Sequence, residues 1–165
     1  FKGAEMTGVD ISDVAIHTAR IHAEKQGLEI KYLNCEAEDL LPAEKESYDL
    51  VTCLEAIEHV PDPAKLVETC SNLCKPGGTI VFSTINRNPK SFLFAIIGAE
   101  YILNLLPKGT HEYKKFIKPS ELSSMMRDNS LEVTEVIGMS YNPITKNYWL
   151  GKDVDVNYLI HARKK

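Results

Sequence analysis

The chain alternates between short apolar stretches with the character of strands and longer stretches with the apolar spacing of helices. Four strand-like stretches fall within the first 86 residues: AEMTGVD, LEIKYLN, YDLVTCL and TIVFSTIN. Two helix-like stretches lie between them, SDVAIHTARIHAEKQG and DPAKLVETCSNLCKPGG, and EDLLPAEKES forms a polar connection. Strands that alternate with helices at this spacing predict a parallel α/β sheet.

The predicted helices begin and end at residues that favour helix termini. Ser12 can cap the first helix and Gly27 can end it. The second helix is expected from Asp62 to about Cys74, before a Pro-Gly-Gly turn. A third is expected over residues 119–129, followed by two strands, LEVTEVIGMSY and VDVNYLIHAR, that pair like a hairpin at one edge. The stretch YDLVTCL is apolar enough to be buried on both faces.

Length and composition indicate one soluble globular domain over residues 1–165. Hydrophobic residues make up 44% of the chain and charged residues 25%, and a net charge of -4 gives no reason to expect a nucleic-acid partner. No apolar run reaches the ~18 residues of a membrane span. The four cysteines lack C-x-x-C spacing, which predicts buried thiols in a reducing compartment.

Polar residues follow three of the predicted strands, at the edge where open parallel sheets bind ligands. Asp10 ends the first strand, residues 36–38 follow the second, and residues 55–59 follow the third. A carboxylate can accept hydrogen bonds from both hydroxyls of a ribose, so Asp10 is a candidate for nucleotide binding. The alternative is an acid that only stabilises the start of a helix.

Several stretches, in this order, carry a family resemblance. TGVDIS, CEAEDL, YDLVTCLEAIEHVPDP and LCKPGGTIVFSTINRN resemble class I S-adenosylmethionine-dependent methyltransferases. KSFLFAIIGAEYILNLLPKGTHEYKKFIKPSEL, GMSYNPITKNYWLG and VDVNYLIHA resemble more narrowly the O-methyltransferases of ubiquinone biosynthesis, which methylate polyprenylated catechol-type phenols. The resemblance implies a Rossmann-like sheet with helices on both faces, and an insertion for membrane or substrate over about residues 88–118.

The resemblance also implies roles for individual residues. Asp10 would hold the ribose of S-adenosylmethionine, Ala37 would lie against the adenine through its backbone, and Leu54 would line the cofactor pocket. The substrates implied are polyprenylated phenols at the 2-polyprenyl-6-hydroxyphenol and 3-demethylubiquinol steps. A methyltransferase of another small phenol, or a non-catalytic scaffold of the same fold bound to membrane and other ubiquinone-biosynthesis proteins, are the alternative functions.

Glu55, Glu58 and His59 match the positions that bind a divalent metal in the family. Two carboxylates and an imidazole suit Mg²⁺, and the histidine makes Mn²⁺ or Zn²⁺ reasonable too. A metal would help a catechol oxygen to lose its proton. In the alternative, no metal binds and His59 acts as a base or packs against the cofactor; His111 is a second candidate base.

One departure from the family pattern concerns the sheet. The family has, before GAEMTGVD, a strand and a G-x-G-x-G loop that wraps the cofactor, and neither occurs in this sequence. In the family's sheet that strand lies between those ending at Asp10 and Leu54. Without it we expect two half-sheets with unpaired edges, which are costly to bury, and we therefore expect this sequence to be part of a longer protein. A molecule that started at Phe1 would be expected to bind the cofactor poorly.

Residues 91–107 include FLFAIIGAEYILNLL, which is almost entirely apolar. Ser91 can start a helix there and Pro107 can end it; at about 22 Å it would be too short to cross a ~30 Å bilayer core. Flanking lysines and Arg87 favour a position in the membrane interface, and a buried lid helix is the alternative. The resemblance implies a cytoplasmic enzyme peripheral to the bacterial inner membrane, or else one on the matrix side of the mitochondrial inner membrane.

Overall fold

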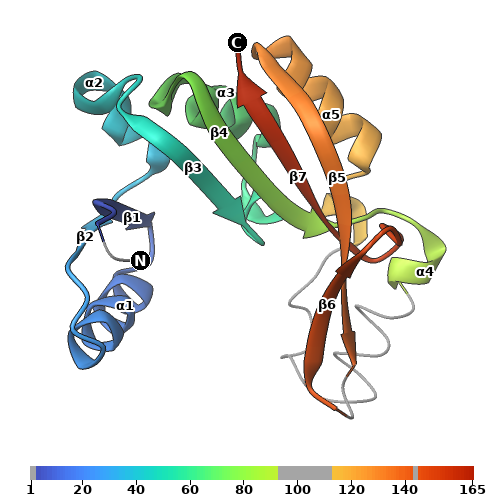
Figure 1. The fold of residues 1–165 in the computed structure, drawn as a ribbon, viewed down its shortest axis with the longest axis horizontal. Coiled ribbons are helices and arrows are strands. Elements are labelled where there is room, and N and C mark those ends of the chain that lie inside the picture. Colours follow the sequence, from blue (N-terminus) through green and yellow to red (C-terminus); the bar gives the residue numbers. More distant parts are fainter. Residues whose placement is uncertain (1–2, 93–112, 143–144) are drawn as a thin grey trace. The chain divides into compact units, whose positions relative to one another are not determined.

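The computed structural model describes residues 3–92, 113–142 and 145–165 (Figure 1). The chain divides into two compact units, Phe1–Lys45 and Glu46–Lys165, and each is described by itself. The strands form two separate sheets, one of two strands in the first unit and one of five in the second. The expectation of two half-sheets is therefore confirmed within the described residues.

The first unit is a β-α-β motif. Strands β1 (Met6–Asp10) and β2 (Ile30–Asn34) pair in parallel, and α1 (Asp13–Lys25) connects them. Ser12 caps α1, as predicted, because its hydroxyl accepts a hydrogen bond from the Ala15 N–H. Gly27, with φ of +65°, follows the last turn, which confirms the predicted helix end.

The polar connection after β2 contains two short helical turns, η1 (Ala37–Leu40) and α2 (Leu41–Glu44). A capping box starts the first of them: the Glu36 side chain accepts from the backbone of Asp39, and the Asp39 carboxylate accepts from the Glu36 N–H at 3.1 Å. This local satisfaction of backbone groups explains why a polar stretch becomes helical.

The five-stranded sheet of the second unit has the order β3-β4-β7-β5-β6 and mixes parallel and antiparallel pairs. The two final strands that the sequence predicted do pair with each other, but β7 lies inside the sheet and not at its edge, because β4 pairs with its other side. The edge is taken by β6, a strand that we did not predict. The strands are β3 (Tyr48–Leu54), β4 (Cys74–Ile85), β5 (Leu131–Asn142), β6 (Asn147–Gly151) and β7 (Asn157–Lys164).

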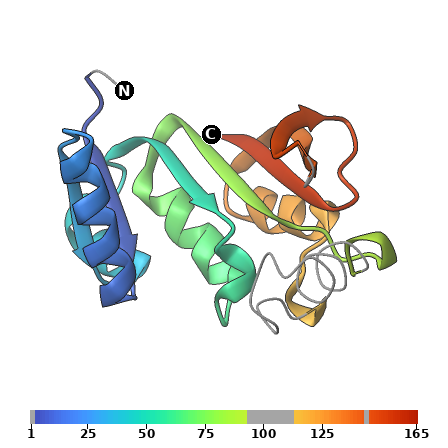
Figure 2. The same cartoon turned by 90° about the horizontal axis from the view of Figure 1, so that it is seen from below.

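Two helices pack side by side on one face of this sheet, α3 (Pro63–Leu73) and α5 (Pro119–Asp128) (Figures 1 and 2). Asp62 caps α3, since its carboxylate accepts from the Lys65 N–H at 3.1 Å. The predicted Pro-Gly-Gly turn is instead the start of β4, where Gly77 takes a φ of +76° and the register with β3 shifts. The described part of this unit also contains the short turns η2 (Ile57–His59), α4 (Pro89–Ser91) and η4 (Tyr113–Lys115).

The core lies between the sheet and these two helices. Phe82 of β4, Tyr158 of β7 and Leu122 of α5 are fully buried in it. The side chains of β3 do not follow the prediction of burial on both faces, because Leu50 is 55% exposed and Leu54 is 52% exposed. Both belong to the outermost strand of the described sheet, in register with Thr79 and Ser83, on the face opposite to α3 and α5.

Candidate active site

Glu55 directly follows β3 and is fixed to two other strands. Its N–H donates to both the carbonyl and the hydroxyl oxygen of Ser83, each at 3.0 Å. In return the Ser83 hydroxyl donates to Oε1 of Glu55 at 2.7 Å, and the Asn157 amide reaches Oε2 at 3.4 Å. Glu55 has a φ of +51°, a left-handed conformation that costs a residue with a side chain of the order of 1 kcal/mol or more. These contacts hold it there.

Glu58 is a carboxylate only 2% exposed in the turn η2. Its Oε2 accepts a hydrogen bond from the Thr84 hydroxyl at 2.8 Å. Its Oε1 is buried and has no hydrogen-bond partner among the residues that the structure describes. The Nε2 atom of His59 lies 3.9 Å from that oxygen, on a side chain that is half exposed. An unsatisfied buried carboxylate oxygen is energetically costly and marks a place for a hydrogen-bond donor or a cation.

The two carboxylates are held on opposite sides of the sheet. Ser83, which binds Glu55, and Thr84, which binds Glu58, are consecutive on β4, and consecutive side chains of a strand point to opposite faces. Within the described part of the chain, no three histidine, cysteine, aspartate or glutamate side chains are grouped as metal ligands. The three expected metal ligands therefore do not converge here, and the metal stays a prediction.

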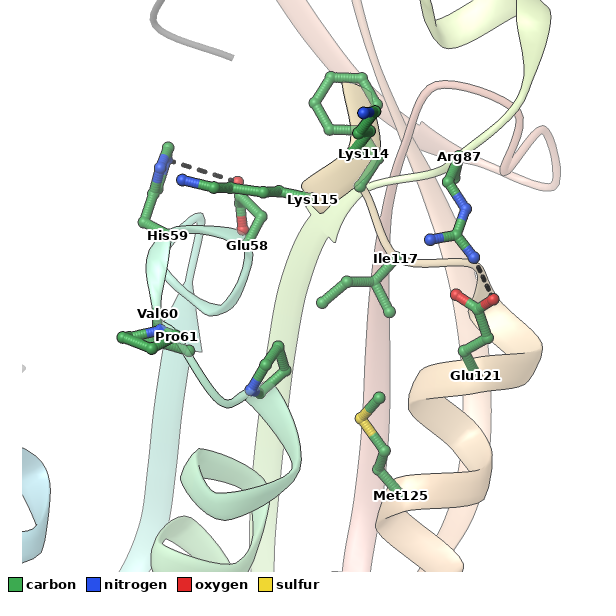
Figure 3. A pocket seen from close by; sticks show the side chains of 12 residues that line it. Glu58, His59, Val60, Pro61, Arg87, Lys114, Lys115, Ile117, Glu121 and Met125 are labelled. Atoms are coloured by element: carbon green, nitrogen blue, oxygen red, sulfur yellow. Dashed lines mark hydrogen bonds and ion pairs between the residues drawn. The ribbon is translucent and has the colours of Figure 1, made fainter. Parts of the chain in front are cut away.

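A pocket of about 510 Å³ opens beside Glu58 and His59 (Figure 3). Arg87, two residues after the end of β4, lines the opposite side and forms an ion pair with Glu121 of α5. Lys115 points towards Glu58 and His59 in this view. The pocket thus combines an acidic edge, cationic side chains and apolar walls. Its remaining lining residues are Val60, Pro61, Pro63, Lys114, Phe116, Ile117 and Met125.

Burial shapes the acid–base properties of two core groups near the pocket. Burial raises the pKa of Cys53 to about 12, with a further contribution from the negative charge of Glu58. Burial also raises the pKa of Tyr158, whose hydroxyl donates to the Ile117 carbonyl at 2.8 Å. Both groups are therefore neutral near pH 7. Of the predicted buried thiols, Cys70 and Cys74 are buried, whereas Cys35 and Cys53 are half-buried, and none of the four forms a disulfide in the part of the chain that the structure describes.

The three predicted cofactor residues are divided between the two units. In the first unit, Asp10 ends β1 and its carboxylate accepts from the Ser12 N–H at 2.7 Å, and Ala37 begins η1 after β2. In the second unit, Leu54 ends β3 with an exposed side chain. Each thus stands at the carboxyl end of a strand or just beyond it, as the sequence predicted, and their roles stay predictions.

The sequence reasoning missed the residues that hold the two glutamates. Ser83 and Thr84 bind them directly, Asn157 of β7 adds a contact to Glu55, and Arg87 lines the pocket. A signal for the first two was present, because the hydroxyls of Ser83 and Thr84 directly follow the apolar run Ile-Val-Phe near the end of a predicted strand. Asn157 reaches the site because β7 pairs antiparallel with β4, and nothing in the residues around Asn157 predicts that pairing.

The segment 91–107 is described only at its start. The described turn α4 begins at Pro89, and its cap is Asn88 and not Ser91, because the Asn88 side chain accepts from the Ser91 N–H at 2.9 Å. Phe92 is 41% exposed and its ring packs edge-on against Tyr113, with centroids 5.4 Å apart. Residues 93–112, including His111, lie outside the described residues. Among the described helices, none combines the length and apolar composition needed to cross a bilayer.

Comparison with known proteins gives consistent matches. A family model described as a methyltransferase domain matches residues 1–82. The chain is 55% identical to the ubiquinone biosynthesis O-methyltransferase of Saccharophagus degradans, covering 99% of this chain and 70% of that protein. It is 57% identical to that of Marinobacter nauticus, covering 98% and 69%. These two proteins are named for O-methylation in the synthesis of ubiquinone.

Solved structures agree in fold. A methyltransferase from Methanosarcina mazei that depends on S-adenosylmethionine aligns with a TM-score of 0.70 at 20% identity, covering 99% of this chain and 83% of that one. Another, from Thermotoga maritima, aligns with a TM-score of 0.66 at 26% identity, covering 97% and 73%. Both place the chain in the Rossmann-like fold of class I methyltransferases.

Proposed function

Because the chain belongs to the family of ubiquinone biosynthesis O-methyltransferases, we propose that the pocket beside Glu58 holds the phenol that this protein methylates. The observation that supports this placement is the buried Oε1 of Glu58, which has no hydrogen-bond partner among the described residues. A phenolic hydroxyl could donate to that oxygen, and the apolar walls formed by Ile117, Met125 and the two prolines suit an aromatic ring.

The reaction is a direct displacement at a methyl carbon. S-adenosylmethionine supplies that carbon as a sulfonium methyl group, and S-adenosylhomocysteine leaves. Glu58 accepts the phenol proton as the oxygen–carbon bond forms and the carbon–sulfur bond breaks. His59, with Nε2 3.9 Å from Glu58 Oε1, is placed to share or pass on that proton. The pocket orients the phenol so that its oxygen meets the methyl carbon in line.

The cofactor binds, in this proposal, along the carboxyl ends of the strands. Asp10 accepts hydrogen bonds from the ribose, the backbone of Ala37 lies against the adenine, and the exposed Leu54 covers the cofactor. The hydrogen bond from the Ser12 N–H orients the Asp10 carboxylate in the first unit, which supports this role. Ser83 is in register with Leu54 on the neighbouring strand, and its hydroxyl holds the Glu55 carboxylate on the same face of the sheet. Glu58 lies on the opposite face.

We also propose that the site binds a divalent metal ion. Glu55, Glu58 and His59 would hold Mg²⁺ or a similar ion, and the ion would lower the pKa of a bound catechol oxygen. The unsatisfied Oε1 of Glu58 beside His59 supports this donor set. The hydrogen bonds of Glu55 to Ser83 and Asn157 oppose it, since they direct that carboxylate away.

Methyl transfer to a short-chain demethylubiquinol analogue tests both parts of the proposal. We expect activity with S-adenosylmethionine in protein that also carries the G-x-G-x-G loop of the family, and an activity loss with chelator that added Mg²⁺ restores. Direct binding of Mn²⁺, measured without substrate, should weaken in Glu58→Gln. Full activity in metal-free buffer would exclude a metal from the mechanism, and Glu58 and His59 would then carry out the proton transfer alone.

The substrates proposed are polyprenylated phenols at the two O-methylation steps, which brings the protein to a membrane surface. We propose that residues 91–107 contact it, with the protein on the cytoplasmic side of the bacterial inner membrane. Phe92, exposed at the start of this segment, supports the proposal, as does the cluster of lysines that follows it. Other ubiquinone-biosynthesis proteins are proposed partners at the same surface.

Replacing Phe92 and Ile96 together with glutamate should reduce binding to anionic vesicles about tenfold or more, because two apolar side chains are lost and two negative charges are added. Cosedimentation with vesicles measures the effect. Because Phe92 packs against Tyr113, a circular dichroism melt must show that the variant stays folded. Unchanged binding by a folded variant would exclude this segment as the anchor.

A further inference from the structure

Among the described residues of the second unit, the ribbon formed by the end of β5 and by β6 exposes a row of large apolar side chains. Tyr148 is 67% exposed, Trp149 51% and Leu150 59%, although the three are consecutive in a strand. Tyr141 of β5 is also exposed, and the centroid of its ring lies 4.5 Å from the centroid of the Tyr148 ring. In Figure 1 this part of the two strands extends beyond the ends of β3, β4 and β7.

Both faces of the ribbon carry large side chains. Tyr141 pairs with Tyr148, and Leu150 lies two residues further along the same face; Trp149 pairs with Ser140 on the other face. A folded protein that docked on the ribbon would cover one face and leave the other in water. The interfacial layer of a bilayer would surround both faces, and tryptophan and tyrosine are the residues enriched at that depth.

The charge of the ribbon complements an anionic surface. Residues 138–152 contain two lysines, Lys146 and Lys152, and no acidic residue, in a chain whose net charge is -4. The two acids that follow are engaged elsewhere, because Asp153 and Asp155 both bind Lys90 of α4, at 2.8 and 3.0 Å. Both carboxylates thus already have a lysine partner outside the ribbon.

We propose that the β5–β6 ribbon, residues 138–142 and 145–152, inserts its exposed aromatic side chains into the headgroup layer of an anionic membrane. This proposal and the proposed function both involve a membrane, but insertion of the ribbon does not depend on residues 91–107. Tyr148, Trp149 and Leu150 enter the interface, and Lys146 and Lys152 contact lipid phosphates. Two attachment points would fix the orientation of the second unit on the surface, which a single segment cannot do.

The chain's single tryptophan makes the test direct, because Trp149 reports on its own environment. With vesicles containing phosphatidylglycerol, we expect its emission to shift to the blue and to be quenched by lipids brominated near the headgroup. Trp149 replaced with serine should bind these vesicles about tenfold more weakly by cosedimentation. Lys146→Gln with Lys152→Gln should weaken binding about fivefold per lysine and reduce its salt dependence.

Controls separate this proposal from the others. Val14→Ser, which removes an apolar side chain that is 75% exposed in the first unit, should leave binding unchanged. The Phe92→Glu/Ile96→Glu variant should still show the Trp149 shift at higher lipid concentration. Methyl transfer to a water-soluble substrate analogue should be unaffected by Trp149→Ser.

If vesicles bind while the Trp149 emission stays unchanged, the ribbon is not a membrane contact. A shift that depends on protein concentration without vesicles would overturn the proposal in favour of a second copy of the chain.

Discussion

Replacing Glu58 with glutamine is expected to lower kcat for methyl transfer about a hundredfold or more, since general-base catalysis typically contributes that much. The amide has the shape of the carboxylate and can still accept the hydrogen bond from Thr84, but it cannot take a proton from the phenol. KM should change less than kcat, because the apolar walls of the pocket are untouched. Initial rates over a range of phenol concentrations separate the two parameters.

Two comparisons make the Glu58 result specific. Glu132→Gln, which removes the same charge at an exposed position of β5, should leave both kinetic parameters unchanged. Thr84→Val removes the hydrogen bond that orients Glu58, so it should lower kcat by a smaller factor, and Thr84→Ser should restore it. A Glu58→Gln enzyme with full kcat and a raised KM would show that this residue only binds substrate.

Replacing Gly138 with alanine is expected to reduce the free energy of unfolding by about 1–3 kcal/mol or more, as overpacking does. A Cβ atom at this position would lie 1.7 Å from the carbonyl oxygen of Asp153, so the backbone of one of the two segments must move. The segment around Asp153 carries the two carboxylates that bind Lys90, so a shift of this segment should weaken both ion pairs. Urea unfolding monitored by circular dichroism gives the free energy.

Gly151→Ala is the matched control for the substitution at Gly138. The two glycines are directly opposite each other in the β5–β6 ladder, but a Cβ atom at Gly151 would meet nothing within 4 Å. We expect its unfolding free energy to equal that of the parent or to rise slightly, since alanine restricts the unfolded chain more than glycine does. Equal losses in the two variants would mean that the close contact with Asp153 does not determine the stability of this corner.

The fold was predictable from local signals where those signals agree with the packing. Ser12 and Gly27 bound the first helix in both sequence and structure, and Asp62 caps the second, because caps depend on neighbours within a few residues. The place of β7 inside the sheet depends instead on pairing with β4, about 80 residues away along the chain. The strand β6 carries polar and aromatic residues exposed on both faces, so it lacks the alternation that predicts strands.

The candidate site was predictable as a list of residues but not as a geometry. Glu55, Glu58 and His59 are close in sequence, which made one shared metal site a natural prediction. The hydrogen bonds to Ser83 and Thr84 separate the two carboxylates, and this separation follows from a strand that pairs with β3 only in the folded unit. Spacing along a chain does not reveal on which side of a neighbouring strand a side chain will be held.

The pairing of Ser83 with Glu55 and Thr84 with Glu58 also limits where this chain can change in length. One residue inserted or deleted between Thr79 and Ser83 would turn each hydroxyl to the other face and exchange the partners of the two glutamates. The register shift at the start of β4, around Gly77, already accommodates unequal strand lengths. Length differences between related chains should therefore gather before Thr79 and spare the four residues that follow it.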